Sequence, residues 1–192
     1  MNEGAKEKPP IQIVELSPDE WQLFRDLKIR SLEEESIAFE DPEEGREKYL
    51  QRAESEWRDI LSGKMSGGRA GESTQVFAKS GQEIVGMVSA IILVAEQGKK
   101  ATVQHMYVDG SYRGQSIGRQ LLQNLVEKLR SRGNLKKIEL QVVVSQIPAI
   151  ELYKSLGFIE VGRREVPRHG QTYDEIEMEL NLSNERRDNT LK

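Results

Sequence analysis

The segment YRGQSIGRQLL, residues 112–122, places two glycines and a serine directly ahead of a stretch with helical spacing of apolar residues. A short glycine-containing turn between a strand and a helix directs unpaired backbone N–H groups at whatever lies in front of the helix. Small side chains let a phosphate group approach that backbone, and two arginines add positive charge. The segment therefore predicts an anion site formed by Arg113, Gly114, Gln115, Ser116, Ile117, Gly118 and Arg119.

Two common phosphate-binding motifs do not fit this segment. No Gly-Lys-Ser/Thr follows the turn, which excludes a P-loop, and the glycine spacing does not match the G-x-G-x-x-G of dinucleotide sites. Taken alone, a tight turn that merely begins a helix is an equally good interpretation of the pattern. The elements around the segment must decide between the two.

Periodicity along the chain predicts the elements that position this turn. Apolar residues four apart, from Tyr49 through Trp57 to Leu61, predict one helix there, and Ser80-Gly81-Gln82 predicts a hairpin turn. The expected order is strand, two helices, three strands, helix, strand, helix and two strands. This order predicts a mixed α/β fold whose sheet is mostly antiparallel and flanked by helices. We expect a single domain over residues 11–182, with flexible tails at 1–10 and 183–192.

Composition excludes several classes of function. The net charge of −4 argues against a nucleic-acid partner. The chain has no cysteine and only His105 and His169, so we expect no metal site. No signal peptide is expected at the amino terminus, and no apolar run is long enough to span a membrane. A cytoplasmic protein with no membrane partner is the expectation that follows.

The glycine-containing segment, the strand IELQVVV and then IPAIELYKSLGF together resemble the GNAT-type N-acetyltransferase superfamily in order and spacing. Residues 113–118 match the family's pattern of a basic residue or Gln, two others, Gly, any residue and then Gly or Ala, except that Ser116 replaces the first Gly. The second family block, Asn-x-x-Ala-x-x-Leu-Tyr-x-x-x-Gly-Phe, is matched at Ala149, Leu152, Tyr153, Gly157 and Phe158, with Gln146 in place of Asn. The resemblance is specific from about residue 75 to residue 180.

The resemblance implies a GNAT-like acetyltransferase fold and acetyl-CoA as cosubstrate, with no metal. In that family the glycine-rich turn binds the pyrophosphate, and the strand ahead of it offers backbone groups to the pantetheine arm, here at Met106, Tyr107 and Val108. A backbone N–H near Met106 or Tyr107 then polarises the thioester carbonyl. Gln146 is expected beside the cofactor.

Tyr153 is the catalytic residue that the resemblance implies. Its phenol is expected to protonate the sulfur that leaves as the acyl group is transferred, although a half-buried packing role also fits a tyrosine on a short helix. Ser116 has two interpretations. It costs strain if the backbone there has positive φ, or its hydroxyl caps the helix or binds phosphate.

No general base stands out. Many relatives have a Glu on the strand before the turn, at the position of Thr102, but residues 101–108 contain no carboxylate. Strict alternation places His105 on the face opposite Thr102, which favours a packed histidine. Glu177 and Asp174 are equally unproven, so proton transfer through water is the preferred account.

The acceptor is expected to be a primary amine on a small molecule or a peptide, attacking directly in a ternary complex. Acidic runs at LEEES and EDPEE suit a cation but are also typical of solvated faces. Trp57 and Tyr49 are expected to pack in the core. A non-catalytic acyl-CoA-binding sensor module is the alternative function, and the sequence does not distinguish a monomer from a homodimer.

Overall fold

The computed structural model describes residues 9–35, 42–65, 70–95, 98–168 and 170–182. Most of both expected tails therefore lies outside the described residues. Within the part of the chain that the structure describes, no helix is both long enough and apolar enough to cross a membrane.

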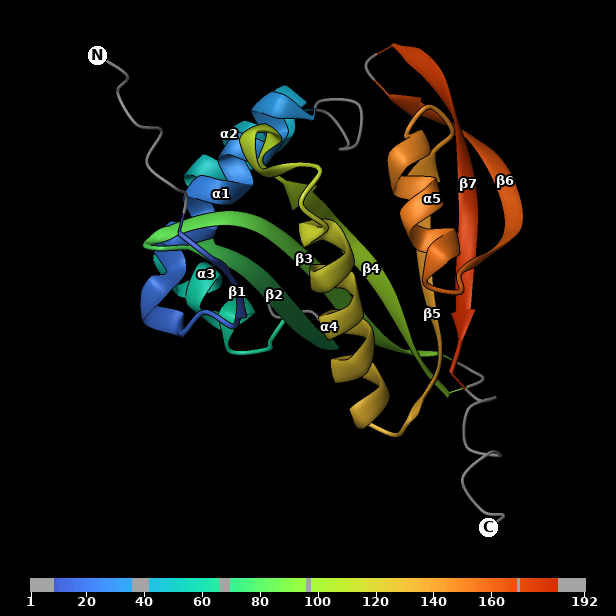
Figure 1. Cartoon of the computed structure of the whole chain (residues 1–192), viewed down its shortest axis with the longest axis horizontal. Helices are drawn as coiled ribbons and strands as arrows, with labels where there is room; N and C mark the ends of the chain where they lie inside the picture. Colours follow the sequence, from blue (N-terminus) through green and yellow to red (C-terminus); the bar gives the residue numbers. More distant parts are fainter. Residues whose placement is uncertain (1–8, 36–41, 66–69, 96–97, 169, 183–192) are drawn as a thin grey trace.

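Strands and helices both contribute to the described part of the chain, with three helices in succession followed by three strands (Figure 1). In order they are β1 (Ile11–Val14), the short 3₁₀ helix η1 (Pro18–Glu20), α1 (Trp21–Glu34), α2 (Pro42–Gln51), α3 (Glu54–Leu61), β2 (Glu72–Ser80), β3 (Glu83–Ala95), β4 (Gly98–Val108), the 3₁₀ helix η4 (Gly110–Tyr112), α4 (Ile117–Ser131), β5 (Leu135–Val143), α5 (Ile147–Ser155), β6 (Ile159–Arg168) and β7 (Gln171–Asn181).

The strands form one seven-stranded sheet in the order β1-β2-β3-β4-β5-β7-β6. Only β4 and β5 run parallel, and every other neighbouring pair is antiparallel. The connection from β4 to β5 must therefore cross over the sheet, and α4 makes that crossover. The predicted mixed α/β fold with a mostly antiparallel sheet is confirmed.

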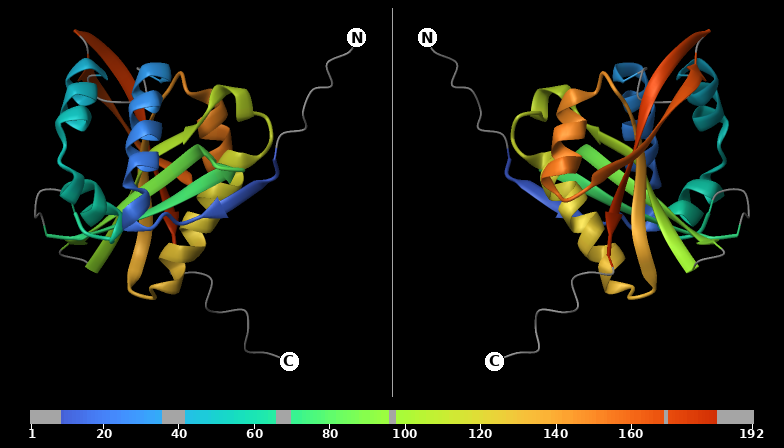
Figure 2. Two further views of the ribbon diagram at one scale, coloured as in Figure 1. Left: turned by 90° about the vertical axis from the view of Figure 1, so that its left-hand side faces the viewer. Right: turned by 90° about the vertical axis from the view of Figure 1, so that its right-hand side faces the viewer.

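Helices cover both faces of the sheet, with α1 to α3 on one side and α4 and α5 on the other (Figure 2). Each side has its own hydrophobic cluster. The α4 face buries Leu121 and Leu125 of α4 against the strands, and the other face packs Trp57 and Phe24 against Phe77 of β2. The rings of Phe24 and Phe77 meet edge to face with centroids 5.3 Å apart. The sheet thus keeps its two faces apolar along most of its length, as a doubly covered sheet must.

One sequence-based prediction about the helices was wrong. The stretch from Tyr49 to Leu61 forms two helices, because Ala53 is extended (φ −63°, ψ 148°) and caps α3. Nothing in the residue type of Ala53 signals the break. The break places the guanidinium of Arg52 over both aromatic rings, 4.7 Å from the Tyr49 centroid and 5.1 Å from the Trp57 centroid. Trp57 is fully buried in the core as expected.

A β-bulge in β4 overturns the prediction from strict alternation. Met87 of β3 pairs with Tyr107, but Ser89 pairs with Gln104, so two residues of β4 stand opposite one of β3. His105 takes up the extra length with a positive φ of 54°. Its ring consequently points to the α1 side, where it meets Ser89, while Met106 packs on the α4 side.

The two parallel strands separate beyond the middle of the sheet. The pairing of β4 with β5 ends at Thr102 and Glu139, although β4 continues to Val108. The gap opens toward the top of Figure 1, at the end where α4 and α5 begin. The β4 bulge at His105 and Met106 lies within this separated part.

Candidate active site

A cleft of about 1020 Å³ occupies the space between the separated ends of β4 and β5. Its walls come from α1, α2, β4, the η4–α4 turn, β5, α5, β6 and β7. Every residue of the predicted binding segment except Gln115 lines it, together with Met106, Tyr107, Val108, Gln146 and Tyr153. The structure therefore brings together nearly all residues that the sequence selected, although they lie as far apart as residues 106 and 153 in the chain.

The first residues of α4 line this cleft. The first backbone bond of the helix runs from Gln120 N–H to the Ser116 carbonyl, at 3.1 Å. The N–H groups of Ile117, Gly118 and Arg119 therefore have no carbonyl one turn earlier to bond. Such a helix start is a ready anion site.

The backbone conformation of Ser116 distinguishes between the strained and the helix-capping interpretations of this residue. It adopts the left-handed conformation, with φ 59° and ψ 15°, and its side chain makes no capping hydrogen bond. The prediction that its hydroxyl caps the helix was wrong, and a glycine at this position would avoid the strain. Gly114 has φ 76°, and a Cβ there would meet open space, so its conformation alone requires glycine. A hydroxyl contact of Ser116 with phosphate stays a prediction.

Gly118 lies close to side chains of β4 and α5. A Cβ on Gly118 would lie 3.1 Å from the Met106 Cε and 3.3 Å from the Leu152 Cδ2. A small side chain would therefore require these two flexible side chains to shift by a few tenths of an ångström, and a large one would require more.

The two predicted arginines bind other parts of the protein. Arg113 donates from Nε to the Val108 carbonyl at 3.0 Å and forms an ion pair with Glu35, which follows α1. Arg119 donates from Nη2 to the Ser155 hydroxyl at 2.9 Å. Both side chains line the cleft mouth, where a phosphate could replace these partners.

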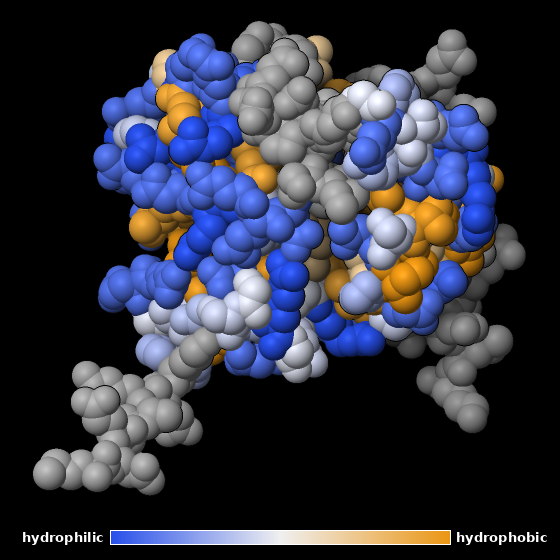
Figure 3. All heavy atoms as spheres, turned by 90° about the horizontal axis from the view of Figure 1, so that it is seen from above, coloured by the Kyte–Doolittle hydropathy of each residue, from blue (hydrophilic) through white to orange (hydrophobic). Residues whose placement is uncertain are grey.

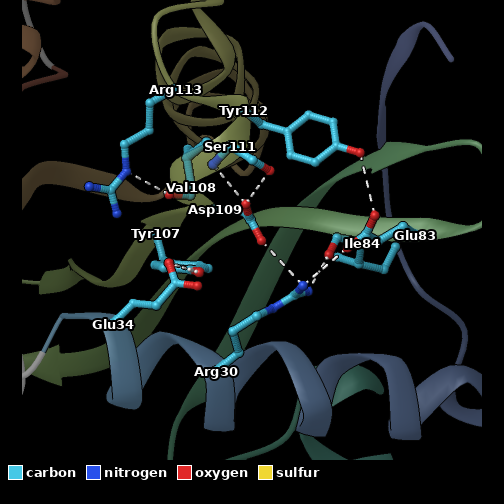
Figure 4. Close-up of polar contacts among 10 residues, drawn as sticks. All are labelled: Arg30, Glu34, Glu83, Ile84, Tyr107, Val108, Asp109, Ser111, Tyr112 and Arg113. Carbon is cyan, nitrogen blue, oxygen red and sulfur yellow. Dashed lines mark hydrogen bonds and ion pairs between the residues drawn. The ribbon is translucent and has the colours of Figure 1, made fainter. Parts of the chain in front are cut away.

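A second group of contacts fixes the end of β4 to α1 (Figure 4). Arg30 of α1 lies 3.2 Å from the Asp109 carboxylate and donates to the Ile84 carbonyl at 3.0 Å. The Tyr107 hydroxyl donates to Glu34 at 2.7 Å. Burial and this carboxylate raise the pKa of Tyr107, which stays a phenol. The Tyr107 side chain therefore points to α1, and only its backbone can serve the cleft.

His105 is in hydrogen-bonding distance of a hydroxyl at each ring nitrogen. Nδ1 lies 3.0 Å from the Ser89 hydroxyl, which also donates to the Gln104 carbonyl at 3.1 Å. Nε2 lies 3.4 Å from the Tyr49 hydroxyl. Burial and the positive charges of Lys28 and Arg52 hold the pKa of His105 well below its usual range. Such an imidazole accepts a proton poorly.

Tyr153 projects from α5 toward the cleft with its ring packed on Phe158, centroids 6.0 Å apart. Burial raises its pKa to about 12, so the group is a proton donor at neutral pH. Among the described residues none hydrogen-bonds its hydroxyl. Gln146 begins α5, and its carbonyl accepts from the N–H groups of Ala149 and Ile150 at 3.0 and 3.1 Å. Its side chain lines the cleft.

Sequence reasoning missed the polar residues on the α1 side of the cleft. Lys28, Glu35, Arg164 and Glu175 line it, and Tyr49 does so as well, which corrects the expectation that Tyr49 only packs in the core. Glu175 is 2% exposed and accepts from Arg164 Nε at 3.0 Å. These residues come from α1, α2, β6 and β7, and no local pattern connects them. An ionisable residue at an otherwise apolar position of a helix, such as Lys28, is the one available signal.

The surface at this end of the molecule is divided (Figure 3). Hydrophilic side chains cover the side of α1 and α2, and apolar ones gather on the side of α5, β6 and β7, where Ile147 at the start of α5 is exposed.

The acidic run EDPEE and the last residue of LEEES lie outside the residues whose side chains the structure describes. Within the described residues no group of three or more His, Cys, Asp or Glu side chains is placed to hold a metal ion.

The chain belongs to the acetyltransferase (GNAT) family, whose model matches residues 28–158. The [ribosomal protein bS18]-alanine N-acetyltransferase of Escherichia coli (strain K12) is 35% identical over 100 residues, covering 51% of this chain and 67% of that protein. The predicted family and enzyme class are confirmed.

Solved structures show the same fold at low identity. A GNAT-family acetyltransferase from Streptococcus pneumoniae has a TM-score of 0.75 at 18% identity, covering 90% of this chain and 99% of that one. Arabidopsis thaliana NAA60 in complex with acetyl-CoA has a TM-score of 0.67 at 17% identity, covering 90% and 98%.

Proposed function

We propose that this protein transfers the acetyl group of acetyl-CoA to the amino terminus of a protein or peptide by direct attack in a ternary complex. The observation that carries the proposal is the cleft between β4 and β5, with a helix start at one end and Tyr153 in its wall. The bS18-alanine relative supports an amino-terminal acceptor.

The cleft suits coenzyme A at three places. The N–H groups of Ile117 to Arg119 and the small Gly114 face an incoming pyrophosphate. Arg113 and Arg119 can exchange their present partners for phosphate oxygens. Beyond Thr102, β4 no longer pairs with β5, so an extended arm can lie along Met106 to Val108 as an added strand.

The β4 bulge and Tyr153 supply the chemistry expected of the site. A backbone N–H at Met106 or Tyr107 can stabilise the charge that develops on the thioester oxygen. As the carbon–sulfur bond breaks, the Tyr153 phenol, with its pKa of about 12, can donate a proton to the sulfur. The acceptor reaches the carbonyl from the α1 side, where the polar groups lie.

A test uses a peptide with a free amino-terminal alanine, the same peptide with a blocked terminus, and a panel of small amines. Release of free CoA thiol with the free peptide alone supports the proposal. Release with small amines alone overturns the peptide acceptor but keeps the transferase. CoA that raises the melting temperature without any turnover identifies the non-catalytic sensor instead.

A further inference from the structure

We infer that Lys28 is the general base of this reaction, taking a proton from the acceptor's ammonium group inside the cleft. The inference rests on the proposed function. Lys28 lies in the middle of α1, is 1% exposed, and lines the cleft together with Tyr49 and His105. A lysine buried so completely needs a reason, because burial disfavours its charged form.

Lys28 lies near the place that we propose for the reacting thioester carbonyl. Its Nζ lies 5.0 Å from the centroid of the Tyr49 ring, and the Tyr49 hydroxyl reaches His105 Nε2 at 3.4 Å. His105 directly precedes Met106 at the bulge, where the backbone N–H for the thioester oxygen is proposed. The amine of Lys28 therefore belongs to the same corner of the cleft, on the side from which the acceptor enters.

The surrounding charges favour a neutral lysine. Tyr49 and Lys48 on α2, neutral His105 on β4 and Glu35 directly after α1 line the cleft together with Lys28, and Arg52 follows α2. Burial, and then the charge of Arg52, lower the pKa of Lys28 to about 7. A base whose pKa lies near the working pH combines a populated neutral form with useful basicity. His105 lacks this match, since its pKa is held far lower.

The proton balance is complete without another reactant. The acceptor ammonium gives one proton to neutral Lys28, and the freed amine forms the carbon–nitrogen bond as the carbon–sulfur bond breaks. Tyr153 gives its proton to the sulfur, and the second proton that leaves the nitrogen passes through water to restore the Tyr153 phenol, so the products are an amide and a thiol. Lys28 then returns its proton to water.

The competing interpretation is that Lys28 is a cation held over the Tyr49 ring for stability alone. Lys28→Arg keeps a permanent cation, and Lys28→Met keeps the length without charge. For a general base, both variants lose about 10²-fold or more in kcat, and the rise of kcat/KM through pH 7 disappears. Lys64→Met, an exposed lysine outside the cleft, is the matched control and keeps wild-type kinetics.

Stability gives a readout that is independent of turnover. The folded pKa of about 7 lies below the unfolded value of 10.5, so wild-type stability is complete above pH 10.5 and is lost as pH falls toward 7. Lys28→Met has no such loss. Its melting temperature should exceed that of wild type at pH 7, with the difference shrinking toward pH 10.

The experiment therefore measures kcat with whichever amine the wild type acetylates, and melting temperatures with and without CoA. The expected result is that both variants are inactive and still bind CoA, and that Lys28→Met is more stable than wild type at pH 7. Wild-type kcat in Lys28→Arg, or a Lys28→Met that is less stable at pH 7, overturns the inference alone. A wild-type chain that binds CoA but acetylates no amine overturns the proposed function and this inference together.

Discussion

Arg113 of the glycine-containing turn forms an ion pair with Glu35, directly after α1. The same guanidinium donates to the Val108 carbonyl, so one side chain connects the turn, the end of β4 and α1. The arginine that we propose as a phosphate ligand is thereby held by a carboxylate that also lines the cleft.

Removing that carboxylate should strengthen CoA binding. A pyrophosphate must draw Arg113 away from Glu35, and a partly exposed ion pair of this kind contributes up to about 1 kcal/mol. We expect Glu35→Gln to tighten CoA binding by up to about 5-fold in calorimetry. Glu33→Gln, which removes only the exposed pair with Arg46, should leave the affinity unchanged. In an Arg113→Gln background Glu35→Gln should have no effect, and an equal effect there would contradict the competition.

The left-handed Ser116 predicts an unusual response to substitution. Ser116→Gly relieves backbone strain but adds unfolded-state entropy, so stability should change little and CoA binding should persist. Ser116→Val adds a β-branched side chain at positive φ and should destabilise the fold by roughly 1–2 kcal/mol. Urea denaturation compares the two variants. A Val variant as stable as the Gly variant would show that this conformation is not maintained in solution.

His105 should make the fold sensitive to acid. Its folded pKa is lowered from 6.5, so the stability associated with it is fully present above pH 6.5 and is lost as the pH falls toward the folded pKa. His105→Asn keeps a residue that tolerates positive φ and removes the titration. The drop in urea midpoint between pH 7 and pH 5 should be smaller in this variant. An equal drop would assign the acid sensitivity to other groups.

Tyr153→Phe separates chemistry from packing. The ring and its contact with Phe158 remain, and only the buried hydroxyl is lost. If the phenol protonates the leaving sulfur, kcat should fall by about 10²-fold while CoA affinity and melting temperature hardly change. Single-turnover kinetics, in which chemistry limits the rate, provide the measurement. Wild-type kcat would leave Tyr153 with a packing role only.

The sequence was most informative about features that are determined by residues close together in the chain. The two strands joined by the turn at Gly81 and the helix that follows the glycine-containing segment each depend on neighbouring residues, and the structure contains all of them. The break at Ala53 and the bulge at His105 have no such signal. Both are set by packing between elements distant in the chain, which periodicity does not record.

The candidate site likewise has one part that the sequence predicted and another part that it did not. Its proposed phosphate-binding segment is contiguous and was predicted from the sequence, whereas Lys28, Glu35 and Glu175 line the same cleft only because the fold brings α1 and β7 to it. Because 31% of the residues in this chain are charged, the sequence does not indicate which isolated charged residues will lie together in the folded protein. The close approach of Met106 to Gly118 is likewise a contact between distant parts of the chain that the sequence did not predict.

Acetyl transfer through the cleft is tested most directly by mass spectrometry of an alanine-initiated peptide incubated with acetyl-CoA and either wild type or Gly118→Leu. A leucine at this position must displace Met106 or Leu152 and fill the cleft between β4 and α5. We predict that the wild type adds one acetyl group to the peptide amino terminus, whereas the variant, folded by circular dichroism, adds none and shows no CoA-induced thermal shift. Peptide acetylation by the folded Gly118→Leu variant at the wild-type rate would contradict the assignment of this cleft as the active site.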